Sequence, residues 1–415
     1  MMGSLDPLGL PLATDVLSGE RADEGLYIPI IERIRNGLQT TGLLFVGDWK
    51  MSALETRAYL TQHQDLYLSP LPFTGTTAEA MEAWMTEGAT KDKTGELERR
   101  VRINDRGHEV LTAEGYEFER TCYAPGRAVD APVWNERVLG VRSPMHAEQQ
   151  AAGLEKRLCH AETTLATLTP PRGRGKRQIT DEATLLEAIA LVLQAHRVDG
   201  LLSVAWEKQV EQTTQDVGRG RGALHREKRV IETIRYHITQ IARQEDRLAD
   251  LRQRFGWKAF VTNAGHLRLS LREAVLCSRN AYRVERIFHR LKSRVQIAPL
   301  FVKLNEQIEG LTYLRTLGVR VLTVTEFVLR RSLETAQVRL PGLHPENKHK
   351  MTDKPTAERI LKAFADISLT IIKNAAGEDI LRRLTPLSGL QEDILQRLGL
   401  GATLYSQLEI QAIET

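Results

Sequence analysis

The sequence predicts an α/β protein with a mixed β-sheet flanked by helices. Residues 42–68 contain a short apolar run, a helical pattern and a second apolar run, the order of a βαβ unit that begins a parallel sheet. Residues 98–124 alternate in places and carry turn signals, which is typical of antiparallel strands, and residues 133–141 predict one more strand. From residue 271 onward the pattern is mostly helical, so the chain should end in a helical C-terminal region.

Length and composition fit a globular protein of more than one domain. At ~150 residues per domain, 415 residues correspond to two or three domains. The composition, 42% hydrophobic and 27% charged, supports a buried core, and the formal charge of +4 alone identifies no partner. The longest aliphatic run, Ala188 to Leu193, is far shorter than the ~20 residues of a membrane span, so no membrane partner is expected.

The N-terminus and the cysteines favour a cytoplasmic location. Residues 1–6 contain no basic segment and no apolar stretch before a cleavage site, so a secretory signal is not expected. The three cysteines, Cys122, Cys159 and Cys277, lie far apart. Neither a disulfide framework nor a paired-cysteine zinc site follows from them, which suits a reducing compartment.

The N-terminal part predicts strands and helices in alternation. Leu8, Leu10 and Leu12 alternate with small or polar residues and, with residues 15–19, predict a strand, a turn and a second strand. The following segments predict, in order, a helix over residues 22–38, a buried central strand over 42–48, a helix over 51–61 and a strand over 65–68.

The remaining elements follow from the same patterns. They are helices over residues 145–168 and from 180 onward, a strand over 201–206, a long charged helix over 230–254, a strand over 256–263 and one helix over 271–296 that ends near Pro299. Ser388 and Gln391 have the spacing of a capping box, so a further helix should begin there.

Residues 281–292 carry the pattern most suited to chemistry. At ~100° per residue, one side of this helix is apolar, and Glu285, His289 and Lys292 share the adjoining side. Glu285 is the single acid among six basic residues between Arg279 and Arg294. A carboxylate in a basic strip suits a Mg²⁺ ion held near a phosphate backbone. The alternative is an amphipathic helix with a solvated basic face and one intrahelical Glu–Arg pair.

Asp48 is the second candidate metal ligand. It ends a predicted strand of the sheet, and open α/β sheets bind ligands at the carboxyl ends of their strands. The alternative role is a cap for the helix that begins near Met51. Together with Glu285, it indicates an acidic metal cluster on a ribonuclease-H-like sheet.

Four segments share their pattern with a known family. They are residues 9–23, Phe45–Ser52, Phe260–Asn263, and Glu285 followed by Lys292. These segments resemble, in order, the second and third strands, the second-aspartate motif, the strand before the catalytic helix, and the end of the tyrosine–arginine–glutamate–lysine signature of DDE transposases of prokaryotic insertion sequences. The resemblance covers nearly the whole chain and is most specific from Tyr282 to Pro299.

The sequence departs from the family pattern in two ways, and these limit which residue roles the resemblance can assign. Ser278 and Ala281 stand where the signature has tyrosine and arginine, so only Glu285 and Lys292 are assigned from it. The family's first catalytic aspartate lies on a strand upstream of the first matching segment. This sequence begins at that matching segment. The chain thus resembles an N-terminally truncated transposase and is expected to be inactive as such. A non-catalytic DNA-binding or oligomerising remnant is the alternative.

The resemblance implies metal-dependent DNA cleavage and strand transfer, that is, DNA transposition and DNA recombination. Asp48 and Glu285 would be catalytic and would bind Mg²⁺ (or Mn²⁺), and the partners would be double-stranded DNA at the element ends and the target, with a homodimer on DNA. Expected DNA-binding residues are Lys292, Arg286, Arg290, Arg294, Arg172, Arg174, Lys176 and Arg177. Trp257 would stack on an unpaired base or be a core tryptophan. Solvated loops are the alternative for the basic cluster at 172–177.

The implied organisation has four parts. Residues 1–70 would be the first part of the ribonuclease-H-like core without its first strand, and residues 71–255 an insertion of strands followed by long helices. Residues 256–335 would be the second part of the core with the glutamate helix, and residues 336–415 the helical C-terminal region.

Overall fold

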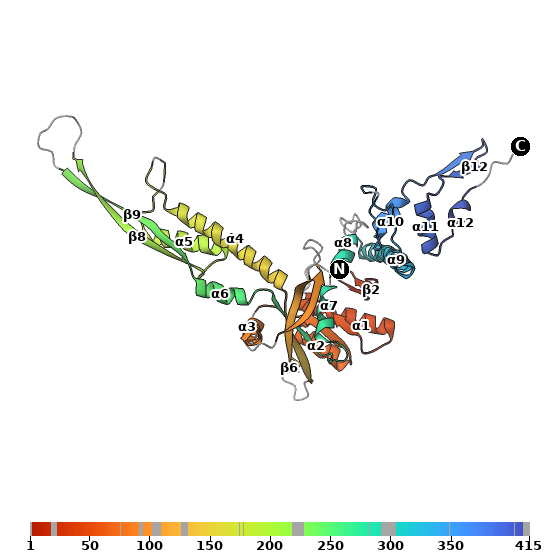
Figure 1. The fold of residues 1–415 in the computed structure, drawn as a ribbon, viewed down its shortest axis with the longest axis horizontal. Coiled ribbons are helices and arrows are strands. Elements are labelled where there is room, and N and C mark those ends of the chain that lie inside the picture. Colours follow the sequence, from red (N-terminus) through yellow and green to blue (C-terminus); the bar gives the residue numbers. More distant parts are fainter. Residues whose placement is uncertain are drawn as a thin grey trace. The chain divides into compact units, whose positions relative to one another are not determined.

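The computed structural model describes most of the chain. The described residues are 2–17, 23–74, 76–90, 94–101, 109–125, 132–173, 175–176, 178–217, 228–280, 282–291, 304–347, 349–401 and 403–409. They belong to two compact units, one formed by Gly42–Ser278 and the other by Met1–Thr41 together with Arg279–Thr415 (Figure 1). Each unit is described by itself below.

A six-stranded mixed sheet forms the centre of the Gly42–Ser278 unit. Its strands, in spatial order, are β3 (Leu44–Val46), β4 (Leu66–Pro70), β10 (Trp257–Thr262), β7 (Val133–Arg142), β6 (Glu109–Tyr123) and β5 (Gly95–Val101). Strands β3 and β4 are parallel and are joined through the 3₁₀ helix η2 (Trp49–Ser52) and α2 (Leu54–Gln62), whereas every other neighbouring pair is antiparallel. The predicted α/β class, with a mixed sheet flanked by helices, is therefore confirmed.

The order of the strands corrects two expectations. Residues 42–48 were expected to form a buried central strand, but β3 lies at the edge of the sheet and Val46 is 45% exposed. Residues 71–255 were expected to leave the sheet, yet β7 pairs with β10 along the whole of β10. Consecutive burial of Val138 and Leu139 shows that both faces of β7 are covered, as in a central strand. The predicted boundary near residue 70 thus falls inside one continuous sheet.

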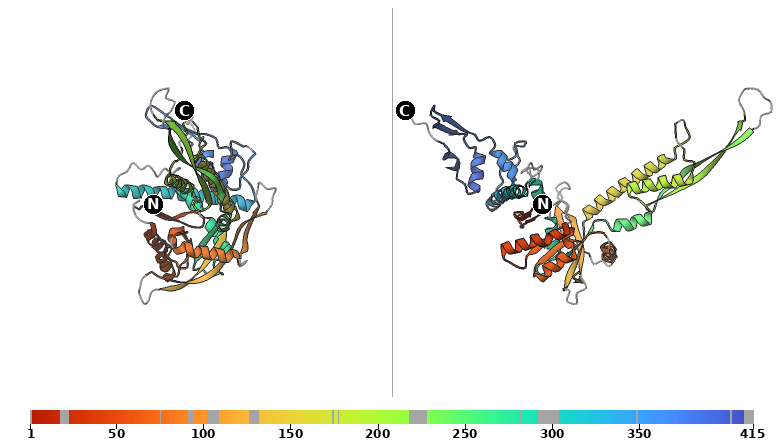
Figure 2. Two further views of the ribbon diagram at one scale, coloured as in Figure 1. Left: turned by 90° about the vertical axis from the view of Figure 1, so that its left-hand side faces the viewer. Right: turned by 180° about the vertical axis from the view of Figure 1, so that it is seen from behind.

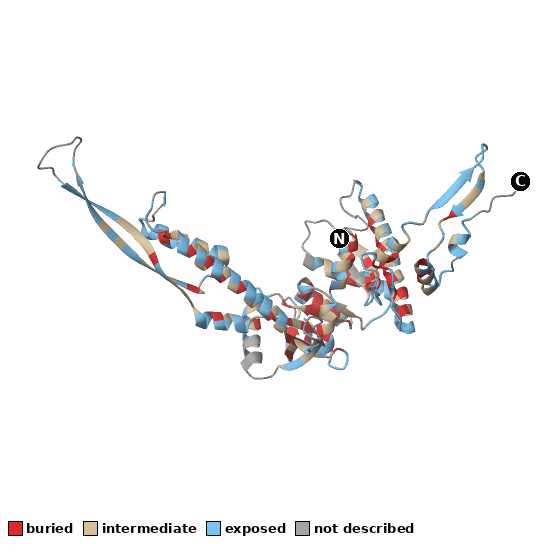
Figure 3. Ribbon diagram, turned by 45° about the horizontal axis from the view of Figure 1, so that its top comes forward, coloured by how far each residue is buried: buried red, intermediate tan, exposed pale blue. Residues whose placement is uncertain are grey.

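The same unit contains a second core, built from helices and a long hairpin. Its elements are α4 (Pro144–Leu168), α5 (Glu182–His196), the antiparallel pair β8 (Leu202–Asp216) and β9 (Lys228–Arg243), and α6 (Glu245–Gln253). Buried leucines of α4, α5 and α6 pack together against the base of the hairpin. The hairpin continues beyond the helices (Figures 2 and 3). The predicted helices at 145–168 and from 180 onward are confirmed.

Residues 230–254 were predicted as one long helix, and this prediction is wrong. Residues Lys228–Arg243 form β9, and only Glu245–Gln253 are helical. The segment contains Val230, Ile231, Thr233 and Ile234, whose branched side chains fit an extended strand. Pairing with β8 along its full length decides the conformation, and β8 correspondingly extends far beyond the predicted residues 201–206.

The other unit is mainly helical and begins with a hairpin. Strands β1 (Met2–Leu5) and β2 (Pro11–Asp15) precede the 3₁₀ helix η1 (Asp23–Leu26) and α1 (Tyr27–Leu38), whose Ile30, Ile31 and Ile34 are buried on one face. The first strand therefore lies earlier than expected. The Asp6 carboxylate explains this, because it accepts the N–H groups of Leu8 and Leu10 and so forms the turn at the residues expected to be strand.

The C-terminal elements differ from an all-helical region. They are α8 (Tyr282–His289), α9 (Asn305–Ala336), α10 (Ala357–Ala363), β11 (Leu369–Lys373), β12 (Asp379–Leu384), α11 (Gly389–Arg397) and α12 (Thr403–Ser406). The predicted capping box of Ser388 and Gln391 is confirmed at the start of α11. The hairpin β11–β12 was missed, and its turn runs from Asn374 to Gly377, where φ is +86°. The Asn…Gly turn is the signal that could have identified it.

The predicted single helix over residues 271–296 is divided in the structure. Residues Leu271–Arg279 form α7, which spans the limit between the two units, and α8 begins at Tyr282. The backbone N–H of Arg283 donates to the carbonyl of Asn280, a residue with low helix propensity that separates the two helices. The predicted end of the single helix, near Pro299, lies outside the described residues.

Gly256 lies at the junction between α6 and β10, where a side chain is expected to lower the stability of the fold. Its φ is +82°, and a Cβ atom there would lie 2.5 Å from the Ser143 carbonyl oxygen and 2.9 Å from the Ala147 Cβ. We expect Gly256→Ala to lower the free energy of unfolding by about 2 kcal/mol, because both the backbone conformation and the contact become strained. Gly265→Ala is the matched control, since a Cβ there would contact nothing within 4 Å. Urea unfolding measures both, and equal losses would contradict the steric argument.

Candidate functional site

Asp48 immediately follows the edge strand β3 and caps the short helix η2. Its carboxylate accepts the Lys50 N–H at 3.0 Å, and its carbonyl oxygen accepts the Ser69 hydroxyl at 2.6 Å, which ties the residue to β4. The side chain is exposed. The capping role considered from the sequence is thus present, and it keeps an exposed carboxylate at the carboxyl end of a parallel strand pair. That position is where α/β sheets bind ligands.

Glu285 lies on the exposed side of α8. Ile287 of α8 and Leu291, just beyond its end, are buried against Val319 of α9, as the apolar spacing predicted, whereas Val284 is exposed. The structure places Glu285 in the mainly helical unit and Asp48 in the sheet unit. Their joint role in binding a metal ion stays a prediction. Within the described ranges, no three His, Cys, Asp or Glu side chains gather where they could hold a metal ion.

Two arginines of the predicted DNA-binding strip are engaged within their own unit. Arg290 is 2% exposed and pairs with Glu326 of α9 and, at 2.8 Å, with Glu358 of α10. Arg286 lies 2.6 Å from the same Glu326 carboxylate, which also accepts the Ala357 N–H at 2.7 Å. The expectation that Arg290 binds phosphate is therefore corrected, because its guanidinium is buried between two carboxylates. Arg286 is only partly exposed and is already paired.

The other predicted DNA-binding residues divide into two groups. Arg172 and Lys176 are exposed on the loop between α4 and α5, and Arg172 pairs with Glu211 of β8. The ion pair offsets part of the positive charge that this loop was expected to offer to phosphate. Lys292, Arg294, Arg174 and Arg177 lie outside the described residues.

Trp257 belongs to an aromatic cluster beside the sheet. Its ring contacts Tyr116 edge to face at a centroid distance of 5.8 Å, and Trp84 of α3 (Thr76–Thr90) and Phe118 complete the cluster. The gap between these rings has a volume of about 10 Å³, at most the space of one water molecule. Of the two roles considered from the sequence, the structure favours the core tryptophan.

A buried ionic network, which the sequence analysis missed, joins four elements of the sheet unit. Glu136 of β7 is 1% exposed, accepts two hydrogen bonds from Arg57 of α2 at 2.6 and 2.7 Å, and accepts one from the Tyr67 hydroxyl of β4 at 2.6 Å. Arg120 of β6 completes the network at 2.7 Å, and the Trp134 indole donates to the Tyr67 oxygen at 2.9 Å. The adjacent charges Glu136-Arg137 inside an apolar strand pattern are the signal that could have identified it.

The network shifts the pKa values of its members in opposite directions. Burial would raise the pKa of Glu136, but the Arg57 charge, the Tyr67 hydrogen bond and the Arg120 charge outweigh burial and leave that pKa lowered. Burial and the neighbouring Glu136 raise the pKa of Tyr67 and raise the pKa of Cys122 to about 11. Glu136 is thus ionised and Tyr67 and Cys122 are protonated at neutral pH, a distribution that suits structural roles rather than a nucleophile or general base.

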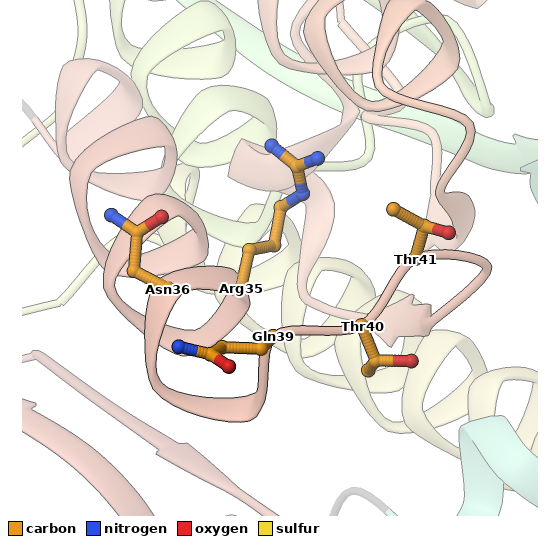
Figure 4. Close-up of a pocket in the computed structure, with 5 residues that line it drawn as sticks. All are labelled: Arg35, Asn36, Gln39, Thr40 and Thr41. Carbon is orange, nitrogen blue, oxygen red and sulfur yellow. The ribbon is translucent and has the colours of Figure 1, made fainter.

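A polar hollow lies at the C-terminal end of α1. It has a volume of about 380 Å³ and is lined by Arg35, Asn36, Gln39, Thr40 and Thr41 (Figure 4). Gln39 adopts the left-handed conformation that ends the helix, with its N–H donating to the Arg35 carbonyl. The five lining side chains include one cation and no carboxylate, histidine or thiol, so the hollow lacks the paired acid and base of a hydrolytic site.

Comparisons with known proteins do not identify a family. No family model, curated protein or solved structure matches the chain. Among the described helices, none combines the length and the apolar content needed to cross a membrane.

Proposed function

We propose that this chain is a DNA strand transferase of the insertion-sequence transposase type, with a ribonuclease-H-like sheet. The observation that carries the proposal is the placement of Asp48, whose exposed carboxylate follows β3 of the parallel β3–β4 pair. The exposed Glu285 on α8 adds a second carboxylate with the residue spacing to Lys292 that the resemblance requires. The proposed activity is metal-dependent cleavage of DNA and joining of the cleaved end to a target.

Asp48 and Glu285 suit Mg²⁺ or Mn²⁺ by chemistry, because these ions prefer carboxylate oxygens. When bound, such ions supply charge stabilisation to the attacking and leaving oxygens of a phosphodiester. In this proposal the two carboxylates bind the ions, and Lys292 contacts phosphate near the scissile bond. The capping hydrogen bond to Lys50 and the Ser69 hydrogen bond fix Asp48 at the end of β3, so its position does not depend on the metal.

The proposal differs from the inactivity that the resemblance implied, because it predicts that the chain cleaves DNA and that this cleavage depends on both carboxylates. Asp48→Asn retains the helix cap, because asparagine caps as well as aspartate, but removes the charge. We expect Asp48→Asn and Glu285→Gln each to slow Mg²⁺-dependent cleavage of DNA flanking the chain's own reading frame by on the order of 10³-fold or more. Glu55→Gln is the control, because Glu55 is an exposed acid of the nearby α2.

A second readout tests the metal site without turnover. Fe²⁺ with ascorbate and peroxide should cut the polypeptide near residues 48 and 285 in the wild-type chain, and excess Mg²⁺ should suppress both cuts. Loss of both cuts in either variant supports a shared ion. Cuts elsewhere, or cleavage of DNA that both variants retain, would refute the assignment. Salt-dependent DNA binding without cleavage or metal-directed cuts would instead support a non-catalytic DNA-binding protein.

A further inference from the structure

The helix α9 has an unusual distribution of polar and apolar residues. The side that packs on its own unit contains seven buried residues, of which four are polar: Thr312, Thr316, Thr323 and Glu326. The Thr316 and Thr323 hydroxyls donate to carbonyls one turn earlier in the same helix, at 2.8 and 2.9 Å. The outward side of the same stretch is more apolar than this buried side. A helix that packed only on its own unit would have the opposite distribution.

The outward side carries an apolar stripe with heptad spacing. The stripe consists of Leu314, Leu317, Val321, Val324 and Val328, with Tyr313 and Phe327 beside it. The intervals alternate between three and four residues, which is the spacing of a seam between two paired helices. Val321 is 64% exposed and Leu314 is 63% exposed, so the centre and one end of the stripe are open.

We infer that the stripe pairs with the same stripe of a second copy of this chain. The large apolar side chains of this face, exposed by 36% to 64%, present on the order of 500 Å² of apolar surface, the size of the largest patches on monomers, which often mark an interaction site. Pairing two such faces buries on the order of 1,000 Å², which reaches the lower limit for a specific interface. This inference does not depend on the proposed catalytic activity.

The charges and the symmetry of the stripe favour an antiparallel pair. Val321 lies at its centre, and apolar residues stand at similar distances on either side, Leu314 opposite Val328 and Leu317 opposite Val324. A two-fold axis near Val321 therefore brings apolar side chains together throughout. The exposed Glu306 and Glu309 near one end of α9 would lie beside the exposed Arg331 near the other end of the partner helix, and the helix dipoles would oppose. A parallel pair would place the two Arg331 side chains together.

The test is the oligomeric state of the full chain by sedimentation velocity over a range of concentrations. We expect the wild-type chain to dimerise. The variant Leu314→Glu/Val321→Glu should self-associate at least 100-fold more weakly, because its dimer would bury two carboxylates per copy, each costing about 1–3 kcal/mol. Leu361→Glu is the matched control, because Leu361 of α10 is 58% exposed but lies off the stripe. Circular dichroism must show the same secondary structure content for the wild-type chain, the double variant and the control variant.

Cysteine crosslinking then tests the arrangement. In a chain with the exposed Cys159 replaced by serine, Val321→Cys should form a disulfide-linked dimer on mild oxidation. Leu314→Cys should not link to itself, because the two copies would lie about 21 Å apart along an antiparallel pair. A wild-type monomer, or a dimer that the double variant leaves intact, would overturn the inference. A Leu314→Cys dimer would replace the antiparallel arrangement with a parallel one and overturn the symmetry argument.

Discussion

Replacing Glu326 with leucine is expected to destabilise the mainly helical unit by about 3–5 kcal/mol, since it breaks a buried ion pair and leaves one partner charged. Glu326 is 5% exposed and accepts from Arg286, Arg290 and the Ala357 N–H. Without it, the guanidinium of Arg290 would retain only Glu358 as a carboxylate partner in this network. The loss should be largest for amides of α8 and α9. Hydrogen exchange in increasing urea is the suitable measurement, because a chain of two units is not expected to unfold in one step.

A paired substitution separates the cost of the orphaned charge from the value of the ion pair. In Glu326→Leu/Arg290→Leu both charges are removed, so we expect a loss clearly smaller than the sum of the two single losses. Glu334→Gln, an exposed acid on the same helix, should change stability by less than about 0.5 kcal/mol. Additive losses in the double variant would mean that Glu326 and Arg290 do not interact as the structure has them.

Replacing Glu136 with glutamine is expected to cost the sheet unit about 3–5 kcal/mol at neutral pH. Arg57, which is 5% exposed, would lose its charged partner, and one of the two oxygens that accept from Arg57, Arg120 and Tyr67 would be replaced by an amide donor. Since Arg57 is on α2 and Glu136 is on β7, the substitution should loosen the packing of α2 on the sheet. Hydrogen exchange of α2 and β4 amides measures the effect, with Glu119→Gln as the control because Glu119 is exposed on the adjacent strand β6.

The same network makes the stability of the sheet unit depend on acid. The pKa of Glu136 is lower in the folded chain than in the unfolded chain, so the unfolded state takes up the proton first as pH falls. The stabilisation is fully present above the ordinary carboxyl pKa and is lost progressively as pH falls through the lowered folded pKa. Wild-type stability should therefore decline more steeply than that of Glu136→Gln below about pH 4.5. Parallel declines would show that other carboxylates dominate the acid response.

Local signals in the sequence were sufficient for several elements because short-range interactions decide them. The isoleucines of α1 define one buried face, and the Ser388–Gln391 capping box satisfies helix N–H groups within one turn. The parallel strands β3 and β4 follow from a helix between two apolar runs. The role of Asp48 as a helix cap also depends only on residues next to it in the sequence. For the same reason, the sequence could place Asp48 correctly between a strand and a helix.

Contacts distant in sequence decided the remaining features. Residues 230–243 satisfy both a charged helix and a strand pattern, and pairing with β8 selects the strand. The six basic residues between Arg279 and Arg294 indicated a surface for phosphate, but Arg290 meets Glu326 and Glu358, which lie 36 and 68 positions away. The sequence by itself therefore determined the α/β class, many helices and the candidate carboxylates Asp48 and Glu285. Only the tertiary structure decided the order of the strands and which charges are buried in pairs, because neither property is encoded within one local segment.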